Sequence, residues 1–294
     1  MSDRTHLFEK TRAKLLAVAY RMLGSRTDAE DIVQDAYLRW HRASTEDIRS
    51  AEAWLVTVVT RLSIDRLRQA KAERESYVGP WLPEPLVNSE APPADAATEL
   101  ASSLSVAFLV VLERLAPEER AAFLLHEVFD SGYDEIAEIL GKSAAACRQL
   151  VSRARKRVQQ ERPCVQVSEA ARTTLLNRFV QAIVTRDKDE MMAVLATDAA
   201  WISDGGGKAR AARKPVLGSD AVARFALAVI GRHADEATFR PVNVNGESGF
   251  ALYFGAHLVS VMTIRTDGAR ILEIFATLNP DKLSQIGAPF RLTQ

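Results

Sequence analysis

The sequence predicts a multidomain protein in which two all-α domains, the second with a helix-turn-helix, are followed by an α+β domain. Three observations favour this fold class. Apolar residues recur at helical spacing up to about residue 162. Beyond residue 168, two helical stretches are followed by runs of β-rich composition. The length of 294 residues exceeds the usual size of one domain and suggests two or three.

Composition narrows the class of protein. An apolar share of 47% is enough to fill hydrophobic cores, and the 38 basic and 38 acidic side chains cancel, so binding of nucleic acid has to rest on local clusters. Two isolated cysteines, Cys147 and Cys164, are too few for a disulfide framework or a CxxC metal site. We find no signal peptide and no stretch of about 18 apolar residues. We therefore expect a cytoplasmic protein that does not enter the membrane.

The chain divides at a linker and at a proline. Residues 1–75 form the first expected domain, and residues 76–98 are expected to be an acidic linker that contains several prolines and no Lys or Arg. The second helical domain covers residues 99–162 and ends strongly basic. Pro163 breaks its last helix. The α+β domain covers residues 168–294, with an expected antiparallel sheet and with Gly246, Gly249 and Gly268 at turns.

The first amphipathic helix has its apolar stripe between Ala29 and Trp40. Thr27, followed three residues later by Glu30, has the pattern of a capping box and predicts the start of this helix. The opposite face presents Asp28, Asp31, Gln34 and Asp35. Acidic residues in the first turn suit the helix dipole, so this face is either simply solvated or binds a partner.

A second helix, over about residues 51–74, combines an apolar side with a basic one. We expect it to bury Trp54, Leu55, Val58, Leu62 and Leu67. Its basic residues are Arg61, Arg66, Arg68, Lys71 and Arg74. Cations near a helix C-terminus suit the dipole, and the functional alternative is contact with DNA phosphates.

The helix-turn-helix is predicted between Tyr133 and Arg157. Gly141 ends its first helix, and Ser143 is a natural N-cap for the second, which runs from about residue 144 to 158. Two helices joined by a turn with glycine form this motif, although an ordinary basic hairpin has the same pattern. The expected DNA-contacting residues are Lys142, Ser143, Arg148, Gln149, Ser152, Arg153, Arg155 and Lys156. Of these, Arg148 and Gln149 are expected to meet bases.

Taken together, residues 1–162 resemble an extracytoplasmic-function (ECF) sigma factor. The resemblance rests on Asp28-Ala-Glu-Asp-Ile-Val-Gln-Asp-Ala-Tyr37, Ala53-Trp-Leu55, Asp65-Arg-Leu-Arg68 and Ser152-Arg-Ala-Arg155, in this order. It implies that Asp28, Asp31, Gln34 and Asp35 dock on the clamp helices of core RNA polymerase. It also implies that Arg61, Asp65, Arg66 and Arg68 read the −10 element of promoter DNA, and that Arg148 to Lys156 read the −35 element. Arg61 departs from the pattern, since many relatives have Asn there.

Three further motifs resemble a subgroup of these sigma factors with a fused C-terminal SnoaL-like cone domain. The first is Trp81, Leu82, Pro83, Glu84 and Pro85, in which a stiff proline frame favours a docking peptide over a disordered tether. The second is Asp204, Gly205, Gly206, Gly207 and Lys208, a tight loop that lacks the full frame of a P-loop. The third is Asn279, Pro280, Asp281, Lys282 and Leu283. The resemblance implies a regulatory contact between domains at these residues.

Our leading hypothesis is a sigma factor regulated in cis by its third domain. The first alternative is a sigma factor whose cone binds a small apolar ligand, and the second is a SnoaL-like enzyme with a DNA-binding tether. His233 and His257 are the histidines available for catalysis in the cone, and neither has a partner that the sequence can place. We therefore expect no catalysis, no cofactor and no metal.

Overall fold

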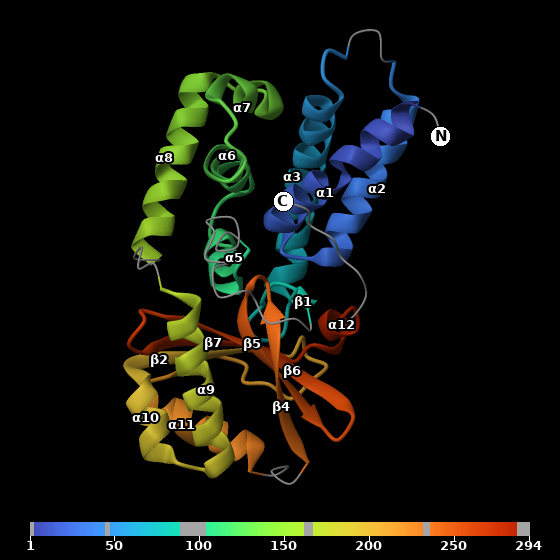
Figure 1. Cartoon of the computed structure of the whole chain (residues 1–294). Coiled ribbons are helices and arrows are strands. Elements are labelled where there is room, and N and C mark those ends of the chain that lie inside the picture. Colours follow the sequence, from blue (N-terminus) through green and yellow to red (C-terminus); the bar gives the residue numbers. More distant parts are fainter. Residues whose placement is uncertain (1–2, 45–47, 89–103, 162–166, 232–235, 287–294) are drawn as a thin grey trace. The chain divides into compact units, whose positions relative to one another are not determined.

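The computed structural model describes residues 3–44, 48–88, 104–161, 167–231 and 236–286. Figure 1 labels most of its elements. Contacts divide the chain into two compact units, one of residues 1–75 and 111–162 and the other of residues 76–110 and 163–288. Pro163, Cys164 and His233 lie outside the described residues.

The first unit is all-α in its described residues. Its helices are α1 (Asp3–Leu23), α2 (Arg26–Arg42), α3 (Ala51–Glu75), α6 (Pro117–Glu127), α7 (Tyr133–Leu140) and α8 (Ala144–Glu161), and α5 (Val106–Leu112) crosses the boundary between the units along the chain. The stripe of α2 is buried at Ala29, Val33 and Trp40, as expected. On α3 the buried line runs through Leu55 and Val59. Trp54, Val58 and Leu62 are only half-buried, although the ring of Trp54 contacts that of Trp40 on α2.

The predicted start of α2 is wrong by two residues. Gly24, with φ of 63°, takes the left-handed conformation directly after α1 ends. Ser25 is then extended and its hydroxyl accepts the N–H of Asp28 at 3.2 Å, so Ser25 and not Thr27 is the N-cap. Glu30 forms an ion pair with Arg26 at 3.2 Å.

The second unit is built on one mixed sheet with the strand order β1-β4-β5-β6-β7-β2-β3. The strands are β1 (Val87–Asn88), β2 (Leu195–Asp204), β3 (Val216–Leu217), β4 (Ala237–Val244), β5 (Glu247–Phe254), β6 (His257–Thr266) and β7 (Ile271–Thr277). The expectation of a purely antiparallel sheet is wrong at one pair, since β2 and β7 run parallel. The β4–β5–β6 meander fixes the direction of β7, which then lies beside a strand formed much earlier in the chain.

The two faces of this sheet bury separate cores. One face is covered by α9 (Glu169–Thr185), α10 (Lys188–Val194) and α11 (Ser219–Ile230), and its core contains Phe179, Trp201 and Ile274. The other face packs Phe275 against Leu82, Val106 and Leu283, the last residue of α12 (Pro280–Leu283). Adjacent residues of β7 therefore serve opposite cores, as the period of a strand requires. Leu82, which we placed in the linker, is part of a core of the second unit.

One predicted turn glycine has a different role. Gly246 and Gly268 have φ of 86° and 94° and lie at turns, as expected. Gly249 lies inside β5, where an added Cβ would be 2.5 Å from Val244 Cγ2 and 2.6 Å from the carbonyl oxygen of Met262. Gly249 is therefore required for close strand packing and not for a turn.

Candidate nucleic-acid interface and motif cluster

The second helix of the helix-turn-helix, α8, has one buried and one exposed side. Gly141 closes α7 with φ of 63°, and the Ser143 hydroxyl accepts the N–H of Ala146 at 3.2 Å. The buried side consists of Cys147, Leu150, Val151 and Ala154. The predicted DNA contacts Arg148, Gln149, Ser152, Arg153, Arg155 and Lys156 are all exposed. The structure thus presents the predicted polar set on one surface.

Acidic residues of α6 engage half of this basic surface. Glu119, of which 7% is exposed, accepts Arg153 at 3.1 Å and Arg157 at 2.8 Å. Glu118 pairs with Lys142 at 3.0 Å, and Glu127 pairs with Arg155. Within the described part of the chain, Arg148 and Lys156 form no ion pair. Hydrogen-bond donors near the start and the end of α8 are therefore left for a ligand.

The basic side of α3 makes contacts with the helix-turn-helix inside the first unit. The Arg61 guanidinium donates to the carbonyl oxygens of Ile139 at 2.8 Å and Glu138 at 2.9 Å, at the C-terminal end of α7. Arg68 pairs with Asp65 at 3.1 Å and with Glu118 at 2.9 Å. Cations suit the carbonyl end of a helix, so Arg61 stabilises α7 in this arrangement.

The predicted polymerase-binding face is split by an ion pair. Asp31, Gln34 and Asp35 are exposed on α2. Asp28 instead accepts Arg66 of α3 at 3.0 Å, and Arg66 also pairs with Glu73 at 3.0 Å. The hydrogen bond to Glu73, and after it the one to Asp28, raises the pKa of Arg66 above its usual range. Asp28 and Arg66, which we assigned to different surfaces, therefore join α2 to α3.

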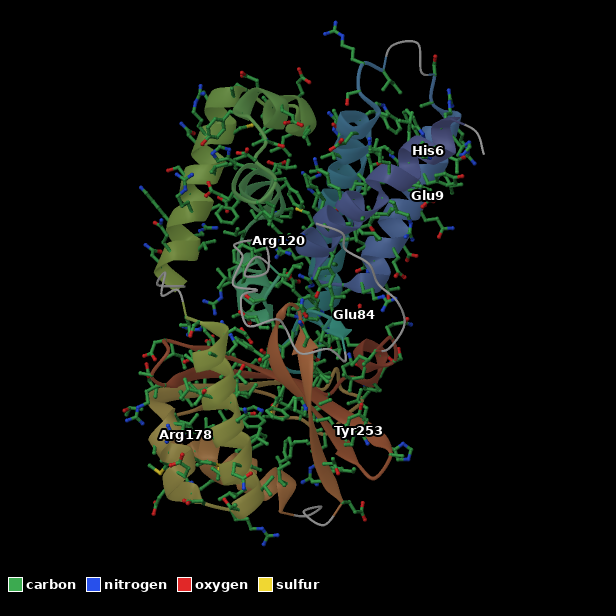
Figure 2. The ribbon with its side chains drawn as sticks, viewed as in Figure 1. His6, Glu9, Glu84, Arg120, Arg178 and Tyr253 are labelled. Carbon is green, nitrogen blue, oxygen red and sulfur yellow. The ribbon has the colours of Figure 1, made fainter. Side chains whose placement is uncertain are left out.

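Sequence reasoning missed a buried cluster of two arginines and one glutamate. Arg120 of α6, labelled in Figure 2, is only 2% exposed. It donates to the carbonyl of Met22 at 2.6 Å and to Glu113 at 2.7 Å. Arg74 pairs with the same Glu113 and donates to the carbonyl of Leu23 at 3.1 Å. Burial lowers the pKa of Arg120 to about 9 and that of Arg74 to about 10. No motif marks these residues, because their partners are carbonyls exposed only by the end of α1.

In the second unit, the three predicted regulatory motifs meet at Asp204, whose side chain is fully buried. One carboxylate oxygen accepts the hydroxyl of Tyr77 at 2.6 Å. The other accepts the N–H of Leu82 at 2.9 Å and the ammonium group of Lys282 at 2.6 Å. Lys282 also donates to the carbonyl of Leu82 and lies 4.1 Å above the ring of Trp81. One carboxylate therefore joins the first motif to the third.

The third motif and the glycine loop complete this motif cluster. Asn279 donates to the Tyr77 hydroxyl at 2.9 Å, and its backbone N–H donates to the carbonyl of Asp204 at 2.9 Å. Gly206 has φ of 58°, and a Cβ there would lie 2.3 Å from the Asn279 amide nitrogen. The loop therefore needs glycine for close approach. Lys208 and Asp281 pair at 2.6 Å on the exposed rim, and Glu84 is buried.

Tyr77 was not singled out from the sequence, although it is central to the motif cluster. Burial, and then its hydrogen bond to Asp204, raises the pKa of its phenol well above 10. The sequence offers one signal for this role, a tyrosine two residues after the end of α3. A buried tyrosine hydroxyl usually finds a hydrogen-bond partner.

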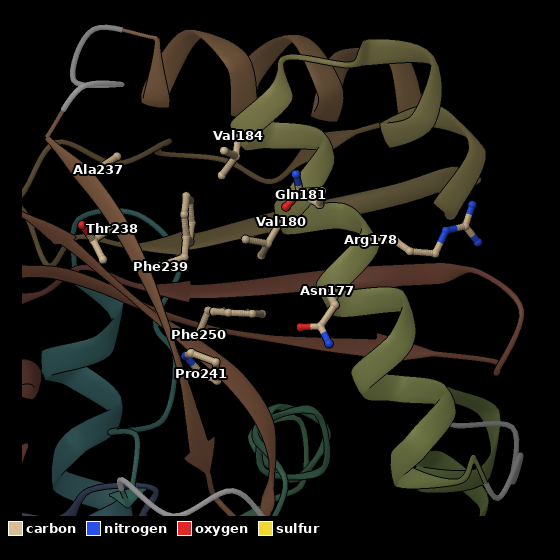
Figure 3. A pocket seen from close by; sticks show the side chains of 10 residues that line it. All are labelled: Asn177, Arg178, Val180, Gln181, Val184, Ala237, Thr238, Phe239, Pro241 and Phe250. Atoms are coloured by element: carbon tan, nitrogen blue, oxygen red, sulfur yellow. The ribbon is translucent and has the colours of Figure 1, made fainter.

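A groove lies on the helical side of the sheet, between α9 and β4 (Figure 3). Its volume is about 660 Å³, and its lining includes Phe239, Pro241 and Phe250 with the amides of Asn177 and Gln181. Arg178 points away from the aromatic residues in Figure 3 and pairs with Glu190 at 2.7 Å. His257 is exposed at the start of β6 and does not line the groove.

Two further properties concern the described residues alone. Among them, no helix has both the length and the apolar character needed to cross a bilayer. Within the same residues, no three His, Cys, Asp or Glu side chains gather closely enough to hold a metal ion.

Comparison with known proteins identifies the class. Residues 7–73 match Sigma-70 region 2, and residues 105–158 match Sigma-70, region 4. These two regions in this order define a sigma factor of RNA polymerase.

Similarity extends beyond these two regions to nearly the whole chain. The chain is 40% identical to the ECF RNA polymerase sigma factor SigJ of Mycobacterium tuberculosis strain H37Rv, over 97% of this chain and 94% of that protein. It is 32% identical to the probable ECF sigma factor SigI of strain CDC 1551, over 94% and 93% of the two chains. The crystal structure of M. tuberculosis SigJ matches with a TM-score of 0.75 and 36% identity, and covers 96% of this chain and 99% of its own.

The chain belongs to the ECF sigma factors, which direct promoter-specific initiation of transcription by RNA polymerase. Its C-terminal α/β domain is shared with the SigJ structure.

Proposed function

We propose that α8 reads the −35 element and that the exposed side of α3 reads the −10 element, in a complex with core RNA polymerase. The observation that carries this proposal is the exposed set on α8, in which Arg148 and Lys156 keep their donors free of ion pairs within the described residues. A recognition helix places its N-terminal half in the major groove, so Arg148 meets a base edge and Lys156 a phosphate. On α3, Asp65 and Arg68 are exposed.

Substitutions at the two ends of α8 test this assignment in the reconstituted holoenzyme. Arg148→Ala should cost about 1 to 3 kcal/mol at one base pair of the −35 element and relax specificity there. Lys156→Ala should lower the affinity for all promoter sequences by the same factor. It should also lower the slope of log affinity against log salt concentration by about 1. Promoter affinities measured over a range of salt concentrations give both numbers. Equal effects of both substitutions on every sequence would refute the assignment.

The polymerase contact falls on the exposed side of α2, at Asp31, Gln34 and Asp35. These residues are free of the ion pair that occupies Asp28, so Asp28 supports the surface from its edge. At low salt, the Asp35→Lys variant should compete less well than the wild-type chain for binding to core polymerase, because the substitution reverses one charge of this surface. Wild-type competition by this variant would contradict the assignment.

The C-terminal domain regulates the sigma regions in cis through the motif cluster. What supports this proposal is that residues Tyr77 and Leu82, which directly follow region 2 along the chain, are bound by Asp204 and Lys282. Any change in the C-terminal domain that releases Asp204 also releases the chain that connects regions 2 and 4. The domain thereby controls the distance that the connecting chain allows between the −10 and −35 contacts.

Run-off transcription with core polymerase tests the cis regulation. A chain that ends near Arg162 is the coarse variant, but it uncovers Leu82 and Val106, which pack on the sheet. Asp204→Asn is sharper, because it keeps the shape of the side chain and removes the charge that holds Lys282. Asp220→Asn, in an exposed ion pair with Lys188 outside the three motifs, is the matched control. Promoter output that is unchanged by Asp204→Asn and by the truncation would sink the proposal.

The groove between α9 and β4 favours a second candidate, in which the C-terminal domain responds to a small apolar ligand. Two phenylalanine rings, Phe239 and Phe250, lie 6.3 Å apart in its lining, with polar amides beside them. A mixed apolar and polar lining is typical of small-molecule sites. Binding of an anilinonaphthalene dye to the full chain, lost in Val180→Trp but kept in Leu217→Trp, is the expected result. Equal dye binding by all three proteins would contradict it.

We assign this chain no catalytic role of its own, no cofactor and a cytoplasmic location. The support for this is membership of a family whose proteins act on RNA polymerase at promoter DNA. The enzyme alternative gains no support from the described histidine of the C-terminal domain, since His257 lies outside the groove.

A further inference from the structure

The arginines of α8 are held in two different ways. Arg153 and Arg157 donate to Glu119, and Arg155 donates to Glu127, so their guanidinium edges are engaged by carboxylates. Arg148 has no such partner within the described residues. Its guanidinium carbon instead lies 5.5 Å from the centre of the Tyr133 ring, above its face.

This difference matters for reading a base. A guanidinium group over an aromatic ring is attracted through its flat face, so the N–H donors at its edge stay available. Recognition of guanine at O6 and N7 uses two of these edge donors. The ring of Tyr133 therefore restricts the Arg148 side chain without competing for the donors that a base needs. A carboxylate would restrict it too, but it would occupy the same edge.

Tyr133 is itself held in place by the neighbouring helix. It is the first residue of α7 and is half-buried. The His126 ring of α6 stacks on it with centroids 4.4 Å apart and an angle of 31° between the planes. His126 Nδ1 in turn donates to the carbonyl of Ser131 at 3.1 Å. Contacts that run from Ser131 through His126 and Tyr133 to Arg148 thus link α6 to the two helices of the helix-turn-helix, α7 and α8.

We propose that Tyr133 is a positioning residue for −35 readout: its ring, fixed by His126, holds Arg148 in the conformation that meets the base. This inference rests on the proposed contact between Arg148 and a base pair. The tyrosine hydroxyl is dispensable for the role, because it faces Arg155 and not Arg148. Only the aromatic face is required.

The test measures affinities of holoenzyme with the full chain for promoters in which each −35 base pair is changed in turn. Arg148→Ala identifies the base pair at which discrimination depends on this arginine. Tyr133→Leu should reduce discrimination at that same base pair by about threefold to thirtyfold, the range expected for loss of a cation–π contact that becomes desolvated. Tyr133→Phe keeps the ring and should retain discrimination.

Two further variants make the test selective. Arg148→Ala combined with Tyr133→Leu should discriminate no less than Arg148→Ala alone, because the tyrosine acts through the arginine. Tyr253→Leu is the matched control, since it removes an arginine–tyrosine contact of the second unit, in which Arg240 lies 4.4 Å above the Tyr253 ring. This control should leave discrimination unchanged.

Discrimination is a ratio of affinities for one sample, so any loss of folded protein cancels from it. A Tyr133→Leu variant that weakens all promoters equally would overturn the inference, as would losses of discrimination that add to those of Arg148→Ala. If Arg148→Ala keeps discrimination at every base pair, the proposed base contact fails, and the role of Tyr133 fails with it.

Discussion

Asp204 and Lys282 form a charge pair taken almost completely out of water, with exposed side-chain fractions of 0% and 12%. Burial of two charges is costly, and the cost is offset here by hydrogen bonds to Tyr77 and Leu82. The contribution of each side chain to stability depends on the other, since removal of one leaves a buried charge without compensation. The pair is therefore sensitive to single substitutions.

Lys282→Met keeps the apolar stem and removes the ammonium group. We expect the free energy of unfolding of the second unit to fall by about 3 to 5 kcal/mol, the usual cost of breaking a buried pair. Denaturant unfolding of the full chain, followed by tryptophan fluorescence, measures it. Lys208→Met, in an exposed pair with Asp281, should cost less than about 1 kcal/mol. Equal losses in the two variants would contradict this account.

The phenol of Tyr77 gives a pH prediction. Its pKa is raised in the folded state, chiefly by burial, so its contribution to stability is complete below pH 10 and is lost as pH rises through the folded value. In an ultraviolet titration of the wild-type protein, Tyr77 should contribute a component that ionises well above pH 10. Tyr77→Phe should remove that late component. Titration curves of the wild-type protein and of Tyr77→Phe that coincide well above pH 10 would show that Tyr77 is not buried against Asp204.

At the scale of elements, α7 is a helix of eight residues whose C-terminal end is secured twice. Gly141 takes the left-handed conformation that closes the helix, and Arg61 donates to two of its last carbonyls. Arg61 is also the residue that departs from the family pattern. In this structure it acts as a cap for α7, which is a physical reason for an arginine at that position.

Gly141→Ala should destabilise the first unit by about 1 kcal/mol, because an L-residue is strained at positive φ. Gly132→Ala is the matched control at the other end of α7, where φ is −69° and an added Cβ meets nothing within 4 Å. This control should change stability by less than about 0.5 kcal/mol. Thermal unfolding of both variants measures the difference. Equal shifts would show that the backbone conformation of Gly141 is not the cause.

The sequence predicts several elements with good accuracy, because periodicity and caps are local signals. Gly141 ends α7 and Ser143 caps α8, as the sequence predicts. Strand β2 was missed, because Leu195–Asp204 mixes small and polar residues on a strand buried from both sides at its C-terminal end. Its parallel pairing with β7 joins segments about 75 residues apart along the chain, which no local pattern encodes.

In the candidate sites, too, features that follow from local sequence patterns are predicted, and those that depend on tertiary packing are not. The exposed residues of α8 follow from helical spacing alone, and the structure places them on one surface. The ion pairs of Glu118 and Glu119 with that surface do not follow, because they depend on how α6 packs against α8. The hydrogen bond between Asp204 and Tyr77 joins positions 127 apart, so the motifs do not indicate what their residues contact.

At the scale of the whole molecule, the second unit is discontinuous in sequence. It takes residues 76–110 from before the helix-turn-helix and residues 163–288 from after it. Leu82, Val106 and Val244 share one core, and Asn245 donates to the carbonyl of Leu104 at 2.8 Å. The described part of the segment between regions 2 and 4 therefore belongs structurally to the C-terminal domain.

Amide hydrogen exchange should show this membership. The N–H of Leu82 donates to Asp204 and that of Leu86 to Asn245, so both amides should be protected to the same degree as the sheet. Asp204→Asn should speed exchange at Leu82 more than at Leu86. If the Leu82 amide of the wild-type protein exchanges as fast as an amide in an unstructured peptide, the assignment is contradicted.

Leu82 and Lys282 are separated by 200 residues along the chain. A ribosome that adds roughly 5 to 20 residues per second needs about 10 to 40 s to cover that distance. During synthesis, both DNA-binding regions are therefore complete before Lys282 exists to hold the segment between them. Every newly made molecule passes through an interval in which its two sigma regions are joined by a segment that has not yet acquired its partners.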